Sequence, residues 1–140
     1  MRIYQMVPAL DYGDAVSNDA IQLHRYFQAL GHESKICAMY HDRRVKKYVS
    51  PLSDAVKAGP SDILLFHFHY DNDLIPYAER FPGRRIVIYH NITPAEYFKG
   101  INKDAVYHCT RGREQLSTLA RIFEVGLGDS DYNRQELQQV

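Results

Sequence analysis

The amino-acid sequence predicts an α/β protein, a Rossmann-like three-layer α/β/α sandwich whose sheet is mainly parallel. Short apolar runs alternate along the chain with segments of helical periodicity, which is the pattern of strands joined by crossover helices. The chain has 140 residues, of which 45% are hydrophobic, and this is enough to bury the core of one domain. No internal repeat interrupts the pattern. We therefore expect a single Rossmann-like domain over residues 1–140.

The first half of the chain is expected to form two strands and two helices. An apolar run at 3–8 predicts the first strand. Asn18 is expected to cap the next helix, because its side chain can accept a hydrogen bond from the free N–H groups of the first turn, and Gly31 to end it. The buried face of this helix repeats at helical spacing, at Ala20, Leu23, Phe27 and Leu30. The remaining segments are a strand, a basic loop or edge piece and a short helix, at 34–40, 41–48 and 51–58.

The second half continues the alternation and predicts four more strands. Apolar runs place these strands at 62–70, 85–91, 105–109 and 123–127. Helical segments are expected around 74–81, through Leu116, Leu119, Ala120 and Phe123, and from 132 to 140. Strands spaced by helices in this way favour a parallel sheet with helices on both faces, joined by right-handed crossovers.

The segment 84–98 delivers two polar side chains, His90 and Asn91, to the end of a buried strand. A helix is expected to start immediately afterwards, with a capping box and a hydrophobic staple. The box would use Thr93 as N-cap, Pro94 at the first helical position and Glu96, and the staple would pair Ile92 with Tyr97. This local structure leaves His90 and Asn91 without a structural task. Because open α/β sheets bind ligands at the carboxyl ends of strands, we expect both residues to line a cleft.

Composition excludes several classes of function. The formal net charge is zero, so there is no overall positive field to hold nucleic acid, and no nucleic-acid partner is expected. The two cysteines, Cys37 and Cys109, sit singly in apolar segments, as buried thiols of a reducing compartment do. The first residues are too polar for a signal peptide, and no apolar run approaches the ~18 residues of a membrane span. We expect a cytoplasmic protein, with the inner face of the membrane as the site of any peripheral attachment.

The loop after the first strand has the position of a Rossmann phosphate loop but not its composition. It contains one glycine, Gly13, so the Gly-x-Gly-x-x-Gly pattern is absent. Asp14 and Asp19 flank the helix N-terminus, where they satisfy the helix dipole and would repel a pyrophosphate. Short carboxylate and amide side chains beside a glycine suit a hydroxyl-rich ligand better. An ordinary capped helix is the alternative.

Residues 66–71 place two histidines on one face of a strand. His67 and His69 alternate with aromatic residues and therefore point the same way. A His-x-His pair can be half of a metal site, which His90 and Asp71 could complete. The favoured alternative is a hydrogen-bonded histidine beneath a helix layer. His69 suits the lining of a polar cleft better than His67.

Two further polar segments are candidates for ligand contacts. Arg111 and Arg113 are expected in the first turn of a helix, where positive charge opposes the dipole, so a bound phosphate or a protein carboxylate would explain them. A solvated surface pair is the alternative. The segment 130–137 offers a helix cap at Ser130 or Asp131, followed by polar side chains at Asn133 and Arg134.

Two strings in combination resemble a known family. They are Tyr-His-Asn-Ile-Thr-Pro-Ala-Glu-Tyr-Phe at 89–98 and Ser-Asp-Tyr-Asn-Arg-Gln-Glu-Leu at 130–137, and the opening strand with the loop Gly13-Asp14-Ala15-Val16 fits the same pattern. Over essentially the whole chain, the sequence resembles the N-terminal half of GT-B glycosyltransferases. The nearest resemblance is to the retaining group 1 enzymes of glycosyltransferase family 4.

The resemblance implies the acceptor-side half of a two-domain enzyme whose active site lies between two Rossmann-like halves. The C-terminal donor-binding domain would then be absent from this chain. His90 would be the catalytic residue beside the reacting sugar, as a hydrogen-bond donor rather than a nucleophile. A sugar nucleotide would be the donor substrate, a glycan, a lipid-linked sugar or another hydroxyl compound the acceptor, and no metal or other cofactor is expected. The patterns and the resemblance together give these substrate-binding residues: Gly13, Asp14, Ala15, Val16, Ser17, His69, Asn91, Thr93, Arg111, Asn133 and Arg134.

Two alternatives belong to other classes of function. A non-catalytic, flavodoxin-like binding or regulatory module of the receiver type would use carboxylates after the first strand, and Asp11 and Asp14 are a loose approximation to them. No lysine follows the 105–109 segment, as such a module would want. A metal-dependent hydrolase would use His67, His69 and His90.

Overall fold

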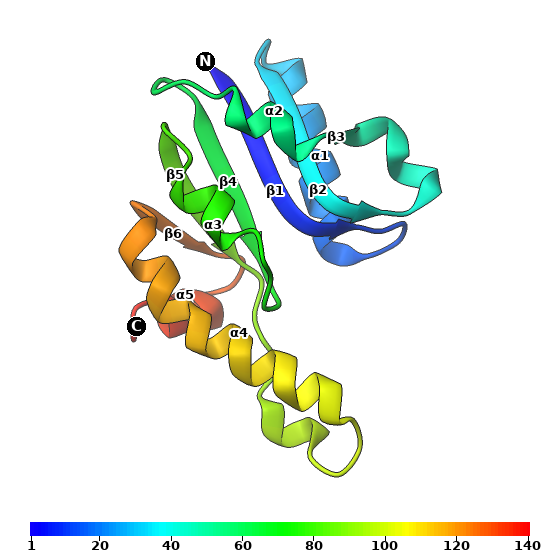
Figure 1. Ribbon diagram of the computed structural model, residues 1–140, viewed down its shortest axis with the longest axis vertical. Helices are drawn as coiled ribbons and strands as arrows, with labels where there is room; N and C mark the ends of the chain where they lie inside the picture. The colour runs from blue at the N-terminus through cyan, green and yellow to red at the C-terminus, as the bar shows by residue number, and fades with distance from the viewer.

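The computed structural model describes residues 1–140 and is built on a six-stranded sheet in which all neighbouring strands are parallel (Figure 1). The strands are β1 (Arg2–Leu10), β2 (Glu33–His41), β3 (Val49–Ser50), β4 (Ile63–Phe68), β5 (Arg84–Tyr89) and β6 (Val125–Gly128). Their order in the sheet is β3-β2-β1-β4-β5-β6. The predicted α/β class with a parallel sheet is confirmed.

Five α-helices and two short 3-10 helices join the strands. They are α1 (Ala15–Ala29), η1 (Arg43–Tyr48), α2 (Leu52–Val56), α3 (Ile75–Glu79), η2 (Ala95–Phe98), α4 (Lys103–Ile122) and α5 (Asp131–Leu137). α1 lies on one face of the sheet, whereas α2, α3 and α4 lie on the other, which gives the three predicted layers (Figure 1). No helix combines the length and the apolar character needed to cross a membrane.

The alternation of side chains along the strands divides the core in two. The larger core lies between the sheet and α2, α3 and α4, and its fully buried aromatic residues are Tyr4, Phe66, Phe68 and Tyr89. The smaller core packs strand residues such as Val7 and Ile36 against Ile21 of α1. α1 packs on β1 and β2 and does not cover β5 and β6. On the face of the sheet that carries α1, the β5 residue Ile88 is therefore only half-buried and the β6 residue Leu127 is exposed. One half of this face therefore has no helix layer.

The expected strand at 105–109 is wrong, because these residues lie inside α4. Asn102 caps this helix by accepting a hydrogen bond from the backbone N–H of Ala105 at 3.0 Å. The buried residues of α4 are Cys109, Gly112, Leu116 and Leu119, which recur every three or four residues and so form a helical stripe. The short apolar run that suggested a strand is the beginning of this stripe. The sixth strand is instead the two-residue β3.

The first helix begins earlier than predicted. Its N-cap is Asp14 rather than Asn18, because the Asp14 carboxylate accepts hydrogen bonds from the backbone N–H and the hydroxyl of Ser17, both at 2.8 Å. The predicted end at Gly31 is confirmed, and its φ of 83° lies in the region that favours glycine. Asp14 therefore has a structural task that the sequence pattern assigned to a residue one turn later.

The predicted capping box and hydrophobic staple after β5 are wrong. Asn91 has a left-handed φ of 75°, which turns the chain before a helix can start. Ile92 is then buried while Tyr97 is 69% exposed, so these side chains form no staple. No side chain caps the short η2 that follows. Ile92 packs instead against Gly112 of α4. The contact is so close that a Cβ atom added at Gly112 would lie only 2.9 Å from Ile92 Cδ1.

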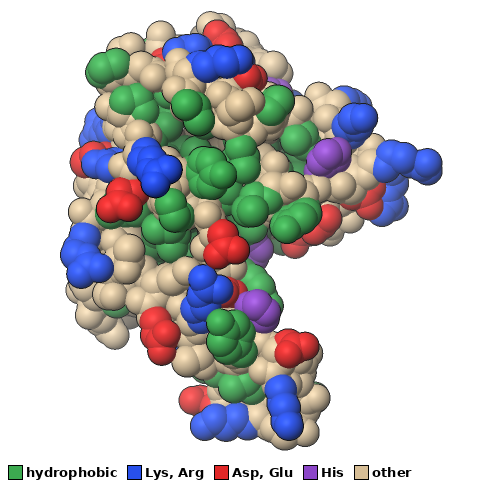
Figure 2. All heavy atoms as spheres, viewed as in Figure 1, with side chains coloured by type: hydrophobic (Ala, Val, Ile, Leu, Met, Phe, Trp, Pro, Cys, Tyr) green, Lys and Arg blue, Asp and Glu red, His purple; other side chains and the backbone are tan.

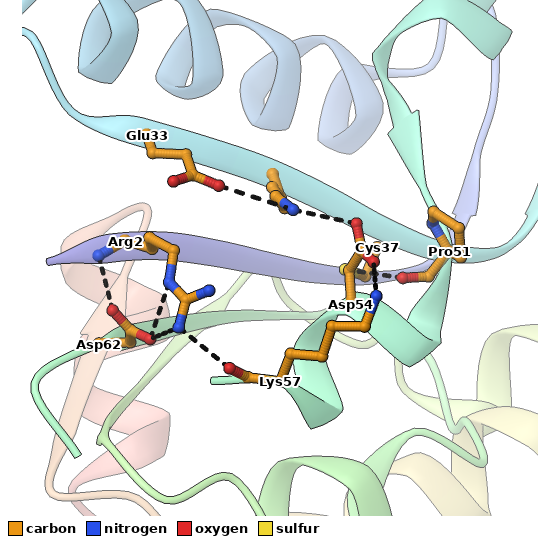
Figure 3. Close-up of polar contacts among 8 residues, drawn as sticks. Arg2, Glu33, Cys37, Pro51, Asp54, Lys57 and Asp62 are labelled. Carbon is orange, nitrogen blue, oxygen red and sulfur yellow. Dashed lines mark hydrogen bonds and ion pairs between the residues drawn. The ribbon is translucent and has the colours of Figure 1, made fainter. Parts of the chain in front are cut away.

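A buried carboxylate ties β1 to β4 at the amino ends of the strands (Figure 3). Asp62 accepts hydrogen bonds from the Arg2 backbone N–H at 2.7 Å and from the Arg2 guanidinium at 2.8 and 3.1 Å. The Gly59 backbone N–H donates a further bond at 2.8 Å. Burial alone would raise the pKa of Asp62, but these bonds outweigh it and hold the pKa below its usual 3.8. The ionised carboxylate therefore anchors the start of β1 beside the start of β4.

The substitution Asp62→Asn is expected to lower the free energy of unfolding by about 2 kcal/mol at pH 7, because the amide cannot accept every bond and the guanidinium loses its charged partner. Urea denaturation followed by circular dichroism measures the loss. A carboxyl group whose pKa is lowered by folding stabilises the protein above its unfolded-state pKa, and this stability disappears as the pH falls through the folded-state pKa. The difference between the two proteins should therefore shrink below about pH 4.

Asp54→Asn is the matched control for this prediction. Asp54 pairs with Lys35 at 3.0 Å and with Lys57 at 3.3 Å, but its pairs are nearer the surface, where screening by water makes ion pairs weak. We expect a much smaller loss of stability in this variant. Equal losses in the two variants would contradict the anchoring role of Asp62.

Candidate functional site at the carboxyl edge of the sheet

The strand order creates a crevice at the carboxyl edge, between β1 and β4. The connection after β1 leads to α1 on one face of the sheet, and the connection after β4 leads to α3 on the other, so the two loops diverge. Open α/β sheets bind ligands at such a switch point. In Figure 1 the strands β1 and β4 run downward, so their carboxyl ends lie near the middle of the molecule, where Figure 2 shows a hollow that opens to the right and has histidine side chains along its inner side.

A chain of polar side chains joins β1, β4 and the end of β5 at this crevice. The Gln5 side-chain N–H donates to the Ala20 carbonyl of α1 at 2.9 Å, which turns the Gln5 carbonyl oxygen toward His67. His67 Nε2 lies 2.8 Å from that oxygen, and His67 Nδ1 lies 3.0 Å from His90 Nε2. Gln5 and His67 are fully buried. Because buried polar groups need partners, the chain fixes the orientation of all three side chains.

Burial keeps the two histidines uncharged at neutral pH. It lowers the pKa of His67 to about 3. It also lowers the pKa of His90, although the carboxylates of Asp129 and Asp19 oppose this shift. Since Gln5 Oε1 is an acceptor, His67 carries its proton on Nε2 and accepts the Nε2–H of His90 at Nδ1. A neutral His90 then has its free lone pair on Nδ1.

The Nδ1 edge of His90 faces a cleft of about 320 Å³. The lining residues are Ala15, Val16, Asp19, His90 and Asp129. Asp129 follows β6 and holds its Oδ2 atom 3.4 Å from His90 Nδ1. The His90 side chain is only 6% exposed, so a ligand can reach one edge of the ring. With two carboxylates and a ring lone pair, the cleft suits a ligand that donates several hydrogen bonds.

The loop after β1 divides its predicted site residues between two tasks. Ala15 and Val16 line the cleft. Ser17 is buried: its hydroxyl accepts a bond from the Asp11 backbone N–H at 2.9 Å and donates to Asp14. Burial opposes ionisation of Asp14, but the bonds from Ser17 outweigh it and lower the pKa of this carboxyl group. Asp14 and Ser17 thus hold the loop and the helix start in place.

Four other predicted residues follow strand ends at this edge. The His69 ring stands edge-on to that of His90 with centroids 6.5 Å apart, and its Nδ1 is buried without a hydrogen-bond partner. Asn91 Oδ1 is also buried and unpaired. Asn133 donates from Nδ2 to the Asp129 carboxylate, so it supports a cleft residue. Gly13 has a φ of 82° and open space where a Cβ would be.

Thr93, Arg111 and Arg134 do not line the cleft. Arg111 lies in the middle of α4 rather than in a first turn, so the helix-dipole argument for a phosphate at this position is wrong. It pairs with Asp71 at 3.2 Å and with Asp73 at 3.3 Å. Arg134 pairs with a carboxylate one turn earlier in α5, and Thr93 is exposed in the link before η2.

The carboxylate that lies near both His67 and His90 is Asp19, not Asp71. Asp71 pairs with His108 at 2.8 Å as well as with Arg111. By contrast, the possible ligand atoms of Asp19, His67 and His90 all lie within 4.8 Å of one another. The interaction with Asp19 is hard to foresee because its carboxylate reaches the site from α1, across the crevice.

Sequence reasoning missed two residues that organise the site. Gln5 is the only polar side chain in the run 3–7 of a buried strand, and that isolated position was its signal. Asp129 directly follows β6, at the same edge as His90. Recognising it required the correct position of β6 beside β5, because the Asp129 backbone N–H bonds to the Tyr89 carbonyl.

The chain matches no family model, no curated protein and no solved structure.

The substitution Gln5→Leu is expected to lower the free energy of unfolding by about 2 kcal/mol, because it leaves the buried Nε2–H of His67 without an acceptor. Urea denaturation at pH 7 measures this loss. Nitrogen-15 NMR of the histidine rings provides a second readout, since His67 should lose its preference for the Nε2–H tautomer.

Gln22→Leu is the matched control, because Gln22 is exposed on α1. We expect little change in either readout for this variant. A Gln5→Leu protein with unchanged stability and unchanged His67 tautomer would contradict the hydrogen-bond chain.

Proposed function

We propose that this chain is the acceptor-side half of a retaining glycosyltransferase, which moves a sugar from a sugar nucleotide to a hydroxyl acceptor. The observation that carries the proposal is the position of His90. The histidine of the 89–98 motif lies at the switch point of a Rossmann-like sheet, its ring is held from behind by His67, and its free edge faces the cleft.

The hydrogen-bonding groups of the cleft support a polyhydroxy ligand. A neutral His90 that donates from Nε2 to His67 offers Nδ1 as an acceptor to a sugar hydroxyl. This differs from the donor role expected from the resemblance, because the inner nitrogen of the ring already uses the proton. The carboxylates of Asp19 and Asp129 offer further acceptors for neighbouring hydroxyl groups.

The charges of the cleft also favour the acceptor side. No lysine or arginine lines the cleft, and its carboxylates would repel a pyrophosphate. Asp14 already occupies the N-terminus of α1, where a phosphate would otherwise bind. The proposal therefore assigns the phosphates of the sugar nucleotide to a second, donor-binding domain outside this chain, and the reaction to the cleft between the two domains.

The regulatory alternative has less support. A receiver-type module needs a free carboxylate after the first strand to accept a phosphoryl group. The Asp14 carboxylate is engaged by both donors of Ser17, so of the two aspartates only the exposed Asp11 has a free carboxylate. These contacts count against Asp14 as a phosphorylation site.

The proposal predicts that the full-length protein transfers sugar and that His90→Ala lowers kcat by at least about a hundredfold without unfolding the domain. The gene should encode a second Rossmann-like domain after residue 140. Release of the nucleoside diphosphate from a panel of sugar nucleotides measures turnover, and circular dichroism checks the fold.

His32→Ala is the matched control, because His32 lies before β2 at the opposite edge of the sheet. This variant should keep its full activity. Unchanged turnover in His90→Ala would remove His90 from the mechanism. Transfer by residues 1–140 alone, at the rate of the full-length protein, would contradict the two-domain proposal.

A further inference from the structure

We propose that His67, His90 and Asp19 form a binding site for a zinc ion. The proposal rests on the geometry of this chain and not on the proposed transferase activity. It also departs from the expectation, implied by the family resemblance, that no metal is bound. The three residues come from β4, the end of β5 and α1, so the site would join both sides of the crevice.

The hydrogen-bonding partners of the two histidines leave one proton too few. His67 Nε2 faces Gln5 Oε1, which can only accept because the Gln5 amide N–H is engaged by the Ala20 carbonyl. His90 Nδ1 faces the Asp129 carboxylate, which is also an acceptor. The inner nitrogens, His67 Nδ1 and His90 Nε2, face each other at 3.0 Å. Three positions therefore call for a proton, whereas two neutral imidazoles supply two.

A metal cation resolves this shortage. With protons on both outer nitrogens, each histidine donates to its acceptor, and the two inner lone pairs are free to bind a cation. Metal-bound histidines characteristically donate their other N–H to a carbonyl or a carboxylate, and both rings have such a partner here, Gln5 for His67 and Asp129 for His90. The outer partners of the two rings are therefore a second observation in favour of a metal site, separate from the closeness of the three ligand atoms.

The distances suit zinc. Zinc binds imidazole nitrogen at about 2.0–2.1 Å, so one ion can reach two nitrogens that are 3.0 Å apart after an opening of a few tenths of an ångström. An Asp19 carboxylate oxygen lies within 4.8 Å of a ring nitrogen of each histidine and would supply the third ligand and a negative charge. Two imidazoles and one carboxylate form a donor set that zinc accepts, with a fourth position left for water or a ligand hydroxyl.

The test is titration of tag-free, EDTA-stripped residues 1–140 with ZnCl2 in an isothermal calorimeter. We expect one ion per chain with a dissociation constant on the order of micromolar or tighter. Cobalt(II) added in place of zinc should give the visible absorption bands of a four-coordinate site. Asp19→Asn should weaken zinc binding at least about tenfold, and His90→Gln should weaken it further.

Asp19 is exposed, so Asp19→Asn tests the site without disturbing the core, and circular dichroism confirms that both variants are folded. The matched control is His108→Gln, which removes the other histidine paired with an aspartate and should leave zinc binding unchanged. Absence of stoichiometric binding, full affinity in either site variant, or loss of binding in the control would contradict the proposal. None of these measurements depends on sugar transfer. A failure of the zinc proposal can therefore be distinguished from a failure of the proposed transferase function.

Discussion

The hydrogen-bond chain from Ala20 through Gln5 and His67 to His90 is the constraint on which the functional edge of this protein depends. It begins at the backbone of α1, passes over β1 and β4 on the face of the sheet that α1 covers, and ends at a ring that faces solvent along one edge. Each member is buried enough that an unpaired donor or acceptor would be costly, so each is held in one orientation. The outermost ring therefore meets a ligand already oriented, which is a condition for selective binding and for catalysis.

The chain can exist because of the strand order. β1 and β4 are neighbours in the sheet, although α1, β2, β3 and α2 lie between them in the sequence. In their register Gln5 pairs with Leu65, which lies two residues before His67 and therefore points to the same face of the sheet. At the opposite edge, Asp62 anchors the start of β1 beside the start of β4. A hydrogen-bonded carboxylate at the amino ends and a hydrogen-bonded histidine near the carboxyl ends thus hold the same pair of strands together.

The two proposals use different tautomers of the same neutral ring. Without a metal, His90 offers Nδ1 as an acceptor, whereas a zinc ion on Nε2 would leave the proton on Nδ1, directed at Asp129. In both cases the cleft is acidic, while nearby arginines are used elsewhere. Arg111 pairs with aspartates beside α4, and Arg113 pairs with Glu136 at 3.0 Å. These intrachain pairs leave the cleft to neutral or cationic ligands.

Local sequence patterns determined the fold class, most of the strands, the end of α1 at Gly31 and the position of His90 at the end of a strand. They could do so because the periodicity of buried residues and the residues that form turns are both set by neighbours in the sequence. They failed where a short apolar run fits both kinds of element, as at 105–109, and where Asn91 turned the chain before the expected cap. Only the tertiary structure decided that Gln5, Asp19 and Asp129 meet His67 and His90, because those contacts join five elements (β1, α1, β4, β5 and β6) that are adjacent only after the parallel sheet has formed and α1 has packed on it.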